Sequence, residues 1–145
     1  MESILITQLP KEDTEAEEVI EIPMTAADRR RVRRSLQAPD GRIFLLALPT
    51  GTVLRVGQVL LREGSRAYRV AAAEEDLLVV RPRSLREAML CGHILGNLHR
   101  DITAGEDHLA TLWDEGLFQR LARAGFEVER TRGPFMGNAP GEHTH

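Results

Sequence analysis

Five histidines are the residues of this chain best suited to chemistry, and all of them lie in its second half. They are His93, His99, His108, His143 and His145. Imidazole suits nickel, copper and zinc as a ligand. The single cysteine, Cys91, offers too few thiolates for a typical structural zinc site. The histidines therefore predict a transition-metal site built on imidazole rather than on sulfur.

The spacing of the histidines limits what one chain can do with them. His93 and His99 are six positions apart, so on one continuous helix they would point about 120° apart. No pair has the spacing of an HExxH zinc motif. One chain therefore offers no complete folded metal site, but a histidine on a two-fold axis appears twice in a dimer. The alternative interpretation is a lone surface or capping histidine.

The chain ends in a second candidate ligand group, His143-Thr144-His145. This sequence places two imidazoles and a terminal carboxylate within three residues, and a chain end can wrap around an ion without distorting a fold. The alternative is a polar chain end with no role. His108 falls on a predicted short strand, where packing or surface exposure is the simpler role. Cys91 falls inside a predicted helix and is interpreted first as a small buried hydrophobe.

Catalysis has little support in the sequence. There is no glycine-rich phosphate loop, no nucleophile elbow and no Cys/His dyad in a recognisable context. The net charge is -3, which argues against a protein that coats nucleic acid or an anionic membrane. No apolar run approaches the roughly 18–20 residues that cross a bilayer. One cysteine and the absence of a secretion signal favour a cytoplasmic location.

An arginine run is the main competing feature. Five arginines fall within residues 29–34, after a helix start at Thr25 and Asp28, and six acids fall within residues 11–21. The run could bind RNA, which often stacks its bases on strand aromatics, but Phe126 is the only aromatic near a suitable strand. We interpret the run mainly as a charged strand edge that resists aggregation.

The first half of the chain predicts short strands separated by turns. Ala38-Pro39-Asp40-Gly41 has the residues that a tight turn requires. Further turns are expected at residues 49–51 and 63–64. Strands are expected at residues 19–22, 32–36, 43–48, 53–55, 58–62 and 68–73. This pattern predicts a small β-barrel or sandwich over residues 1–74.

The second half predicts a different unit over residues 75–132. Ser84 and Glu87 have the spacing of a capping box that begins a helix, and Leu85, Ala88, Met89 and Gly92 follow at helical spacing that would permit close packing. Asp114 and Gly125 bracket a second helix. Strands are expected at residues 77–81, 102–104, 108–111 and 126–130. The order βαββαβ predicts a ferredoxin-like domain, so the whole chain is α+β. Residues 133–145 are expected to form a mobile tail.

The stretch His93-Ile94-Leu95-Gly96-Asn97-Leu98-His99 resembles the Leu-Gly-Asn-Arg-His signature of UreE-type urease accessory proteins. Residues 40–42, 45–55 and 57–60 are similar to the family's N-terminal domain, and residues 28–35 are similar to its arginine-rich segment. Residues 70–81 are similar to the strand region between its domains. The resemblance covers nearly the whole chain, with its parts in the family's order.

The resemblance implies a non-enzymatic nickel metallochaperone. Such a protein binds Ni(II) and delivers it to apo-urease together with other accessory proteins, including a GTPase. It also implies a homodimer formed through the ferredoxin-like domain and an N-terminal domain similar to the peptide-binding module of heat-shock chaperones. His99 matches the family's interfacial nickel ligand, and we expect His143 and His145 to complete the site. The same ligands would accept zinc or copper.

The chain departs from the family pattern in four places. Leu98 replaces the usual Arg, and Asp101 stands where Pro is common. Residues 112–115 lack the further histidines of some members. The tail has two histidines where some members have many, so high nickel storage is not expected. Two alternatives stay open: an RNA-binding or ribosome-associated module using Arg29–Arg34, and a protein-interaction chaperone with incidental metal affinity.

Overall fold

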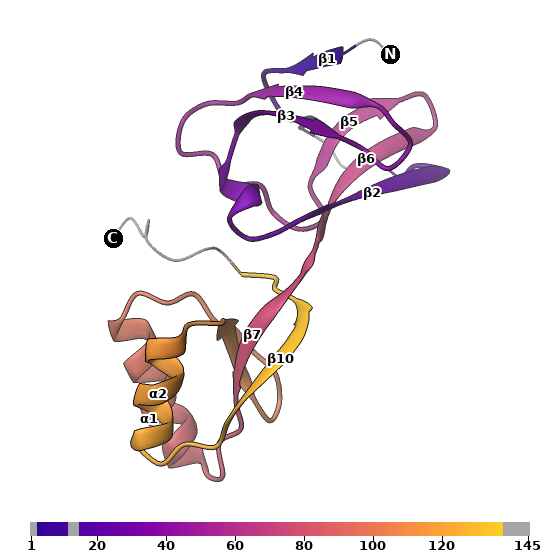
Figure 1. Ribbon diagram of the computed structural model, residues 1–145. Coiled ribbons are helices and arrows are strands. Elements are labelled where there is room, and N and C mark those ends of the chain that lie inside the picture. The colour runs from indigo at the N-terminus through magenta and orange to yellow at the C-terminus, as the bar shows by residue number, and fades with distance from the viewer. Residues whose placement is uncertain (1–2, 12–14, 138–145) are drawn as a thin grey trace. The chain divides into compact units, whose positions relative to one another are not determined.

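The computed structural model describes residues 3–11 and 15–137. The chain forms two compact units, residues 1–73 and 74–145 (Figure 1). Both units are rich in strands, and two α-helices lie in the second, so the α+β class is confirmed. Within the described ranges, no helix is long and apolar enough to span a membrane.

The first unit consists of short strands and a turn of 3-10 helix. Its elements are β1 (Ser3–Ile6), β2 (Glu18–Met24), η1 (Asp28–Arg30), β3 (Arg33–Gln37), β4 (Ile43–Ala47), β5 (Val59–Glu63) and β6 (Arg66–Ala72). They form two three-stranded sheets of order β1-β4-β3 and β2-β6-β5. In each sheet one outer strand runs parallel to the centre and the other antiparallel. Of the predicted barrel or sandwich, the described residues form two separate sheets and no closed barrel, and no strand forms at residues 53–55.

The core of the first unit draws on both sheets. Phe44 from β4 and Tyr68 from β6 are fully buried, and their rings meet edge to face with centroids 5.0 Å apart. Alternation along the strands places these side chains inward because successive residues of a strand face opposite sides. Leu36, Ile22 and Val70 join the same cluster. Alternation along the strands thus produces the core that holds the two sheets together.

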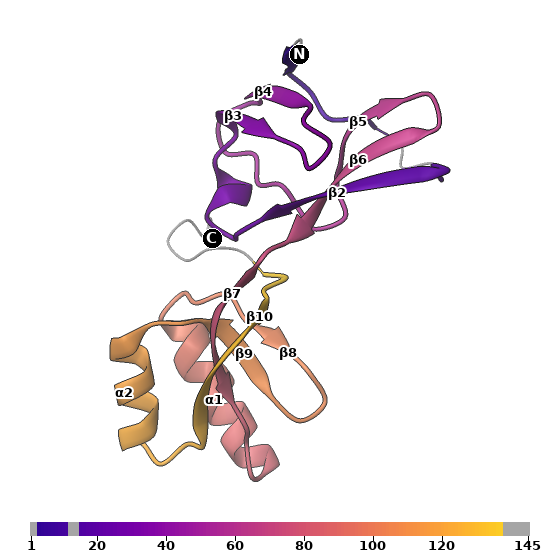
Figure 2. The same cartoon turned by 45° about the vertical axis from the view of Figure 1, so that its right-hand side comes forward.

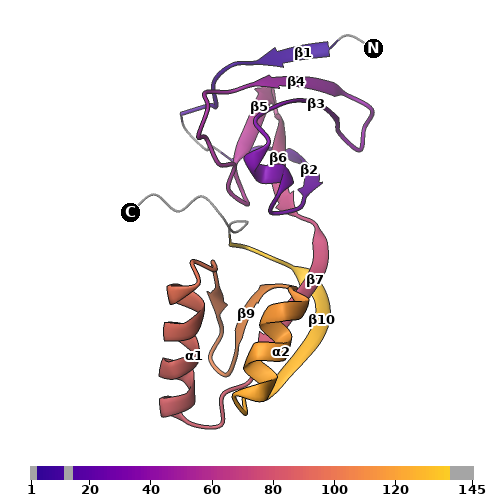
Figure 3. The same ribbon diagram turned by 60° about the vertical axis from the view of Figure 1, so that its left-hand side comes forward.

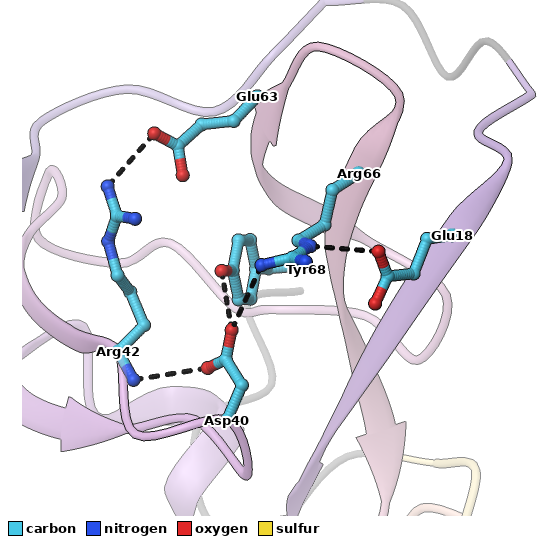
Figure 4. A network of polar contacts seen from close by, with 6 residues as sticks. All are labelled: Glu18, Asp40, Arg42, Glu63, Arg66 and Tyr68. Atoms are coloured by element: carbon cyan, nitrogen blue, oxygen red, sulfur yellow. Dashed lines mark hydrogen bonds and ion pairs between the residues drawn. The ribbon is translucent and has the colours of Figure 1, made fainter.

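A polar network connects the turn before β4 to the other sheet (Figure 4). The Asp40 carboxylate accepts hydrogen bonds from the Tyr68 hydroxyl at 2.7 Å and from the Arg42 backbone N–H at 3.1 Å. The hydrogen bond from Tyr68 is the largest cause that holds the pKa of Asp40 below its ordinary value. Arg66 lies 3.7 Å from the same carboxylate and 3.1 Å from Glu18. The network therefore fixes the predicted turn at residues 38–41.

The second unit has the element order βαββαβ. Its elements are β7 (Glu74–Val80), α1 (Leu85–Asn97), β8 (Thr103–Ala104), β9 (Leu109–Leu112), α2 (Glu115–Arg123) and β10 (Val128–Pro134). The strands form one sheet of order β10-β7-β9-β8, with every neighbouring pair antiparallel. Both helices lie on one face of this sheet (Figure 3). The core between the helices and the sheet includes Leu78, Cys91, Leu95, Leu117 and Leu121.

The predicted helix caps of the second unit are confirmed. The Ser84 hydroxyl accepts a hydrogen bond from the Glu87 backbone N–H at 3.1 Å. The Asp114 carboxylate accepts one from the Leu117 backbone N–H at 2.9 Å. These side chains satisfy backbone donors that a helix start otherwise leaves without partners. Local capping chemistry thus fixes where α1 and α2 begin.

The end of the second unit differs from expectation. The sequence predicts the last strand at residues 126–130, but β10 runs from Val128 to Pro134, where it pairs with Glu74 of β7. Phe135 beyond it is 1% exposed. Residues 133–137 are therefore part of the fold, and the predicted tail from residue 133 is wrong for this segment. Residues 138–145 lie outside the described residues.

Candidate metal-binding site

His99 lies directly beyond the C-terminus of α1, in a turn made of residues 96–101 that we call the His99 turn. The His99 N–H donates to the Gly96 carbonyl at 3.0 Å, and the Arg100 N–H donates to the Leu95 carbonyl at 2.9 Å. This pair of bonds is the Schellman motif, which satisfies carbonyls at a helix end. The motif requires a left-handed residue at the position of His99, and His99 has φ of 57°.

The same motif ends α2 with a different residue. Gly125 occupies the equivalent position with φ of 91°, and Phe126 donates back to the Leu121 carbonyl at 3.1 Å. Glycine is the usual choice there because a Cβ atom disfavours left-handed backbone. In the described residues His99 is the one non-glycine residue with positive φ. Such a strained residue at a surface points to a functional side chain.

Two side-chain contacts hold the His99 turn against neighbouring elements. Arg100 donates to the Asp114 carboxylate at 2.9 Å, and the Thr111 hydroxyl donates to the Asp101 carbonyl at 2.8 Å. The pKa of Asp114 lies below its ordinary value, mainly because the Leu117 N–H donates to the carboxylate, with Arg100 adding to the effect. The residue after His99 is thus fixed to the start of α2. The imidazole of His99 itself is exposed.

The chain returns to the His99 turn at the end of the described residues. An ideal Cβ atom built on Gly137 would lie 2.7 Å from the Asp101 Oδ2 atom and 2.8 Å from the Phe135 ring. The backbone at Gly137 is therefore in close contact with a residue two positions from His99. The predicted ligands His143 and His145 lie outside the described residues, so the structure does not place them.

The remaining histidines and the cysteine lie elsewhere. His93 is exposed on α1. His108 lies before β9 rather than on a strand, and its Nδ1 atom is 2.8 Å from an Asp107 carboxylate oxygen. Cys91 is fully buried as expected, and burial raises the pKa of its thiol, which disfavours a metal-binding thiolate. Across residues 3–11 and 15–137, no group of three or more His, Cys, Asp or Glu side chains could hold a metal ion.

A cleft of about 530 Å³ lies at the opposite end of α1 from His99. Ser84, Leu85 and Ala88 line one side, and residues 104–109 line the other. Figure 2 shows the β8–β9 hairpin, to which the second group belongs. A helix of 13 residues is about 20 Å long, so the cleft is separate from the His99 turn. His108 belongs to this cleft, and no residue of the His99 turn lines it.

The outer side of α1 is apolar. Leu85, Met89 and Leu90 are 73%, 65% and 45% exposed, and we call them the exposed α1 face. Leu85, Met89 and His93 are spaced four residues apart and therefore follow one stripe of the helix. The core side of α1 is formed instead by Cys91, Leu95 and their neighbours. The helical spacing of Leu85 and Met89 is confirmed, and both side chains lie on the exposed side of α1 rather than in the core of the unit.

Sequence reasoning missed three features of this region: the exposed α1 face, the left-handed backbone of His99 and the close approach at Gly137. The first had a signal, because an apolar stripe of Leu85 and Met89 beside a second stripe of Cys91 and Leu95 gives α1 two apolar sides. The left-handed backbone of His99 follows from the hydrogen bonds at the end of α1, and residue types alone do not reveal those bonds.

Comparison with known proteins gives consistent matches. Residues 4–73 match the family described as UreE urease accessory protein, N-terminal domain. A urease accessory protein UreE from Synechococcus sp. (strain JA-3-3Ab) is 42% identical over 148 residues, which covers 100% of this chain and 99% of the relative. One from Deinococcus radiodurans is 48% identical over 86% of this chain and 80% of the relative. One from Burkholderia mallei (strain ATCC 23344) is 36% identical over 84% of this chain and 70% of the relative.

The chain has two compact units, and these relatives match it over most of its length. The matches define an accessory protein of urease maturation, which is a chaperone and not an enzyme. The chain belongs to the UreE family of urease accessory proteins.

Proposed function

We propose that this protein is a homodimeric, cytoplasmic metallochaperone that binds Ni(II) and delivers it to apo-urease. His99 from both subunits supplies the central ligands, and His143 and His145 complete the site. Urease apoprotein and the other accessory proteins, including a GTPase, are its partners. The observation that carries the proposal is the exposed His99 imidazole, held in left-handed backbone at the end of α1.

The strain at His99 supports a functional role for its side chain. A glycine there would satisfy the same helix-end hydrogen bonds without a Cβ penalty, as Gly125 does at the end of α2. Retaining histidine at such a position costs stability, and a ligand role supplies a reason for that cost. Imidazole suits nickel, and also zinc and copper at the same site.

The exposed α1 face supports the dimer. A contiguous group of large apolar side chains on a surface commonly marks an interaction site. A two-fold axis parallel to α1 along this face would cover Leu85, Met89 and Leu90 and would also bring the two helix ends that carry His99 together. One His99 per subunit then becomes two in the assembly. Because no three-ligand group exists in the described part of one chain, a shared site fits the residues present.

The proposal also assigns a separate role to each of the two units. The order βαββαβ and the sheet order β10-β7-β9-β8 support a ferredoxin-like domain for metal binding and dimerisation. We assign this domain to residues 74–137, a peptide-binding-like domain to residues 1–73 and a histidine-bearing tail to residues 138–145.

The RNA-binding alternative is weakened by the arginine run itself. Arg29 is 1% exposed and donates to the Met24 carbonyl at 2.8 Å, so it serves the fold rather than a surface. Arg31 and Arg34 both lie 3.8 Å from the Asp28 carboxylate. RNA binding that weakens steeply with salt would favour this alternative. Nickel binding without transfer to apo-urease would favour the protein-interaction chaperone.

The test is a nickel titration by calorimetry on the native protein, on His99→Ala and on His93→Ala. Both histidines are exposed on or beside α1, so His93→Ala is a matched control. We expect His99→Ala to lose the tightest site and His93→Ala to keep it. A tight site on each subunit that survives His99→Ala would contradict the proposal.

A further inference from the structure

His99 keeps its left-handed backbone, with φ of 57°, only as long as its neighbours hold it there. A Cβ atom disfavours this conformation, and residues that adopt it persist where the surrounding structure fixes them strongly. At the end of α2 the equivalent residue is Gly125, which adopts positive φ without such support. The contacts beside His99 therefore decide how firmly its imidazole is placed.

One carboxylate connects the end of α1 to the start of α2. The Asp114 Oδ1 atom accepts from the Leu117 backbone N–H at 2.9 Å and so caps α2. The Asp114 Oδ2 atom accepts from the Arg100 guanidinium, also at 2.9 Å. Arg100 directly follows His99, and its backbone N–H makes the helix-end bond to the Leu95 carbonyl. The ion pair therefore holds the same residue that completes the left-handed turn.

This ion pair is less exposed than a similar pair elsewhere in the unit. The side chains of Arg100 and Asp114 are 27% and 33% exposed, whereas those of Arg81 and Glu129 are about half exposed at the same 2.9 Å separation. Charges partly removed from solvent are screened less than exposed ones. Arg81 thus offers a matched control for Arg100.

A second contact holds the next residue of the His99 turn. The buried Thr111 hydroxyl donates to the Asp101 carbonyl at 2.8 Å. Leu98 before His99 and Ile102 after it pack against the core of the unit. The turn is thus anchored on both sides, and the Arg100 ion pair is the anchor nearest to His99 on its C-terminal side.

We propose that Arg100 and Asp114 are positioning residues for metal binding, and that their ion pair holds His99 in the left-handed conformation that presents its imidazole. This inference rests on the proposed nickel-binding function. Neither residue contacts the metal in this account. When the pair is broken, the turn opens for part of the time, and the apparent affinity falls with the fraction of competent molecules.

The charge of Arg100 separates positioning from a direct electrostatic effect. Arg100→Met removes a positive charge beside His99, so Coulomb repulsion alone would make this variant bind Ni(II) more tightly. Positioning predicts weaker binding instead. Asp114→Asn breaks the pair from the other side, and asparagine still caps a helix as well as aspartate does.

The experiment measures the nickel Kd by calorimetry for the full-length Arg100→Met and Asp114→Asn variants, their double variant and the Arg81→Met control. Thermal denaturation verifies that each variant is folded. We expect each single variant to raise the Kd roughly fivefold, the double variant to raise it no further, and Arg81→Met to keep the native value. At saturating nickel, the ligand-field absorption should match that of the native protein in every variant, because the ligands are unchanged.

Amide hydrogen exchange of the metal-free protein tests the conformation itself. In Arg100→Met the backbone N–H groups at positions 99 and 100 should exchange about fivefold faster than in the native protein. The Phe126 N–H makes the equivalent bond at the end of α2 and should keep its native rate.

Two results would overturn the positioning role and leave the proposed function standing. One is native exchange at positions 99 and 100 in Arg100→Met, and the other is nickel binding by this variant that equals or exceeds that of the native protein. Losses that add in the double variant would show that the two residues do not act as a pair and would overturn it as well. Native affinity in His99→Ala would instead overturn the proposed function.

Discussion

His99 lies in left-handed backbone, where it completes the hydrogen bonds that end α1. A residue with a Cβ atom loses roughly 1 kcal/mol or more in this conformation relative to glycine. We therefore expect His99→Gly to be more stable than His99→Ala by about 1 kcal/mol, although both lack the imidazole. Urea denaturation of the two variants measures the difference.

The comparison of these two variants isolates the backbone effect, since each removes the same side-chain contacts. Both should fail to bind nickel at the tightest site. Equal stability of His99→Gly and His99→Ala would show that the backbone at this position carries no strain and would remove one support for a ligand role.

Asp40 and Tyr68 predict a pH-dependent contribution to stability. The folded state lowers the pKa of Asp40, chiefly through the Tyr68 hydroxyl, so this contribution is present above the unfolded pKa of about 3.9 and is lost as pH falls through the folded value. Tyr68→Phe should therefore cost about 1–2 kcal/mol at pH 7 and progressively less below about pH 4. Chemical denaturation at several pH values tests this. A cost that is the same at pH 7 and at about pH 2 would contradict the assigned bond.

At the scale of elements, α1 is the helix with two apolar sides. The exposed α1 face includes Met89, which we expect to be buried in the dimer. Met89→Glu should raise the dimer dissociation constant at least about 100-fold, because each subunit would bury an unpaired carboxylate. Analytical ultracentrifugation measures the change.

Leu5→Glu is the control for Met89→Glu, since Leu5 is 62% exposed on β1 of the other unit. This control should remain dimeric. Loss of the dimer in Leu5→Glu but not in Met89→Glu would place the interface on the first unit and contradict the proposed arrangement.

Elements fixed by local chemistry were predictable from the sequence. Ser84 and Asp114 begin the two helices, and Gly125 ends the second, because capping and left-handed backbone depend on a few neighbouring residues. Other features depend on contacts distant in sequence. β10 extends to Pro134 because β7 provides partners along its whole length. The helical spacing of Leu85 and Met89 predicts a helix but does not distinguish a side chain of the core from an exposed one, and both are exposed.

The candidate site was predictable only in part. A resemblance to known proteins identified His99, whose placement beyond the end of α1 agrees with the expected helix end. The contact of Gly137 with Asp101 joins residues 36 positions apart and depends on the folded sheet. The presence of a glycine does not by itself predict such a contact, since Gly133 and Gly137 are both glycines but have different surroundings.

At the scale of the whole molecule, the central claim is that two subunits share one nickel ion through His99. Native mass spectrometry tests it most directly, because it reports the assembly and the metal count together. The account predicts a dimer of 16.2 kDa chains with one tightly bound nickel ion, and a metal-free dimer for His99→Ala under the same conditions. A monomer that carries its own nickel ion, or a dimer that keeps its tightly bound nickel in His99→Ala, would contradict it.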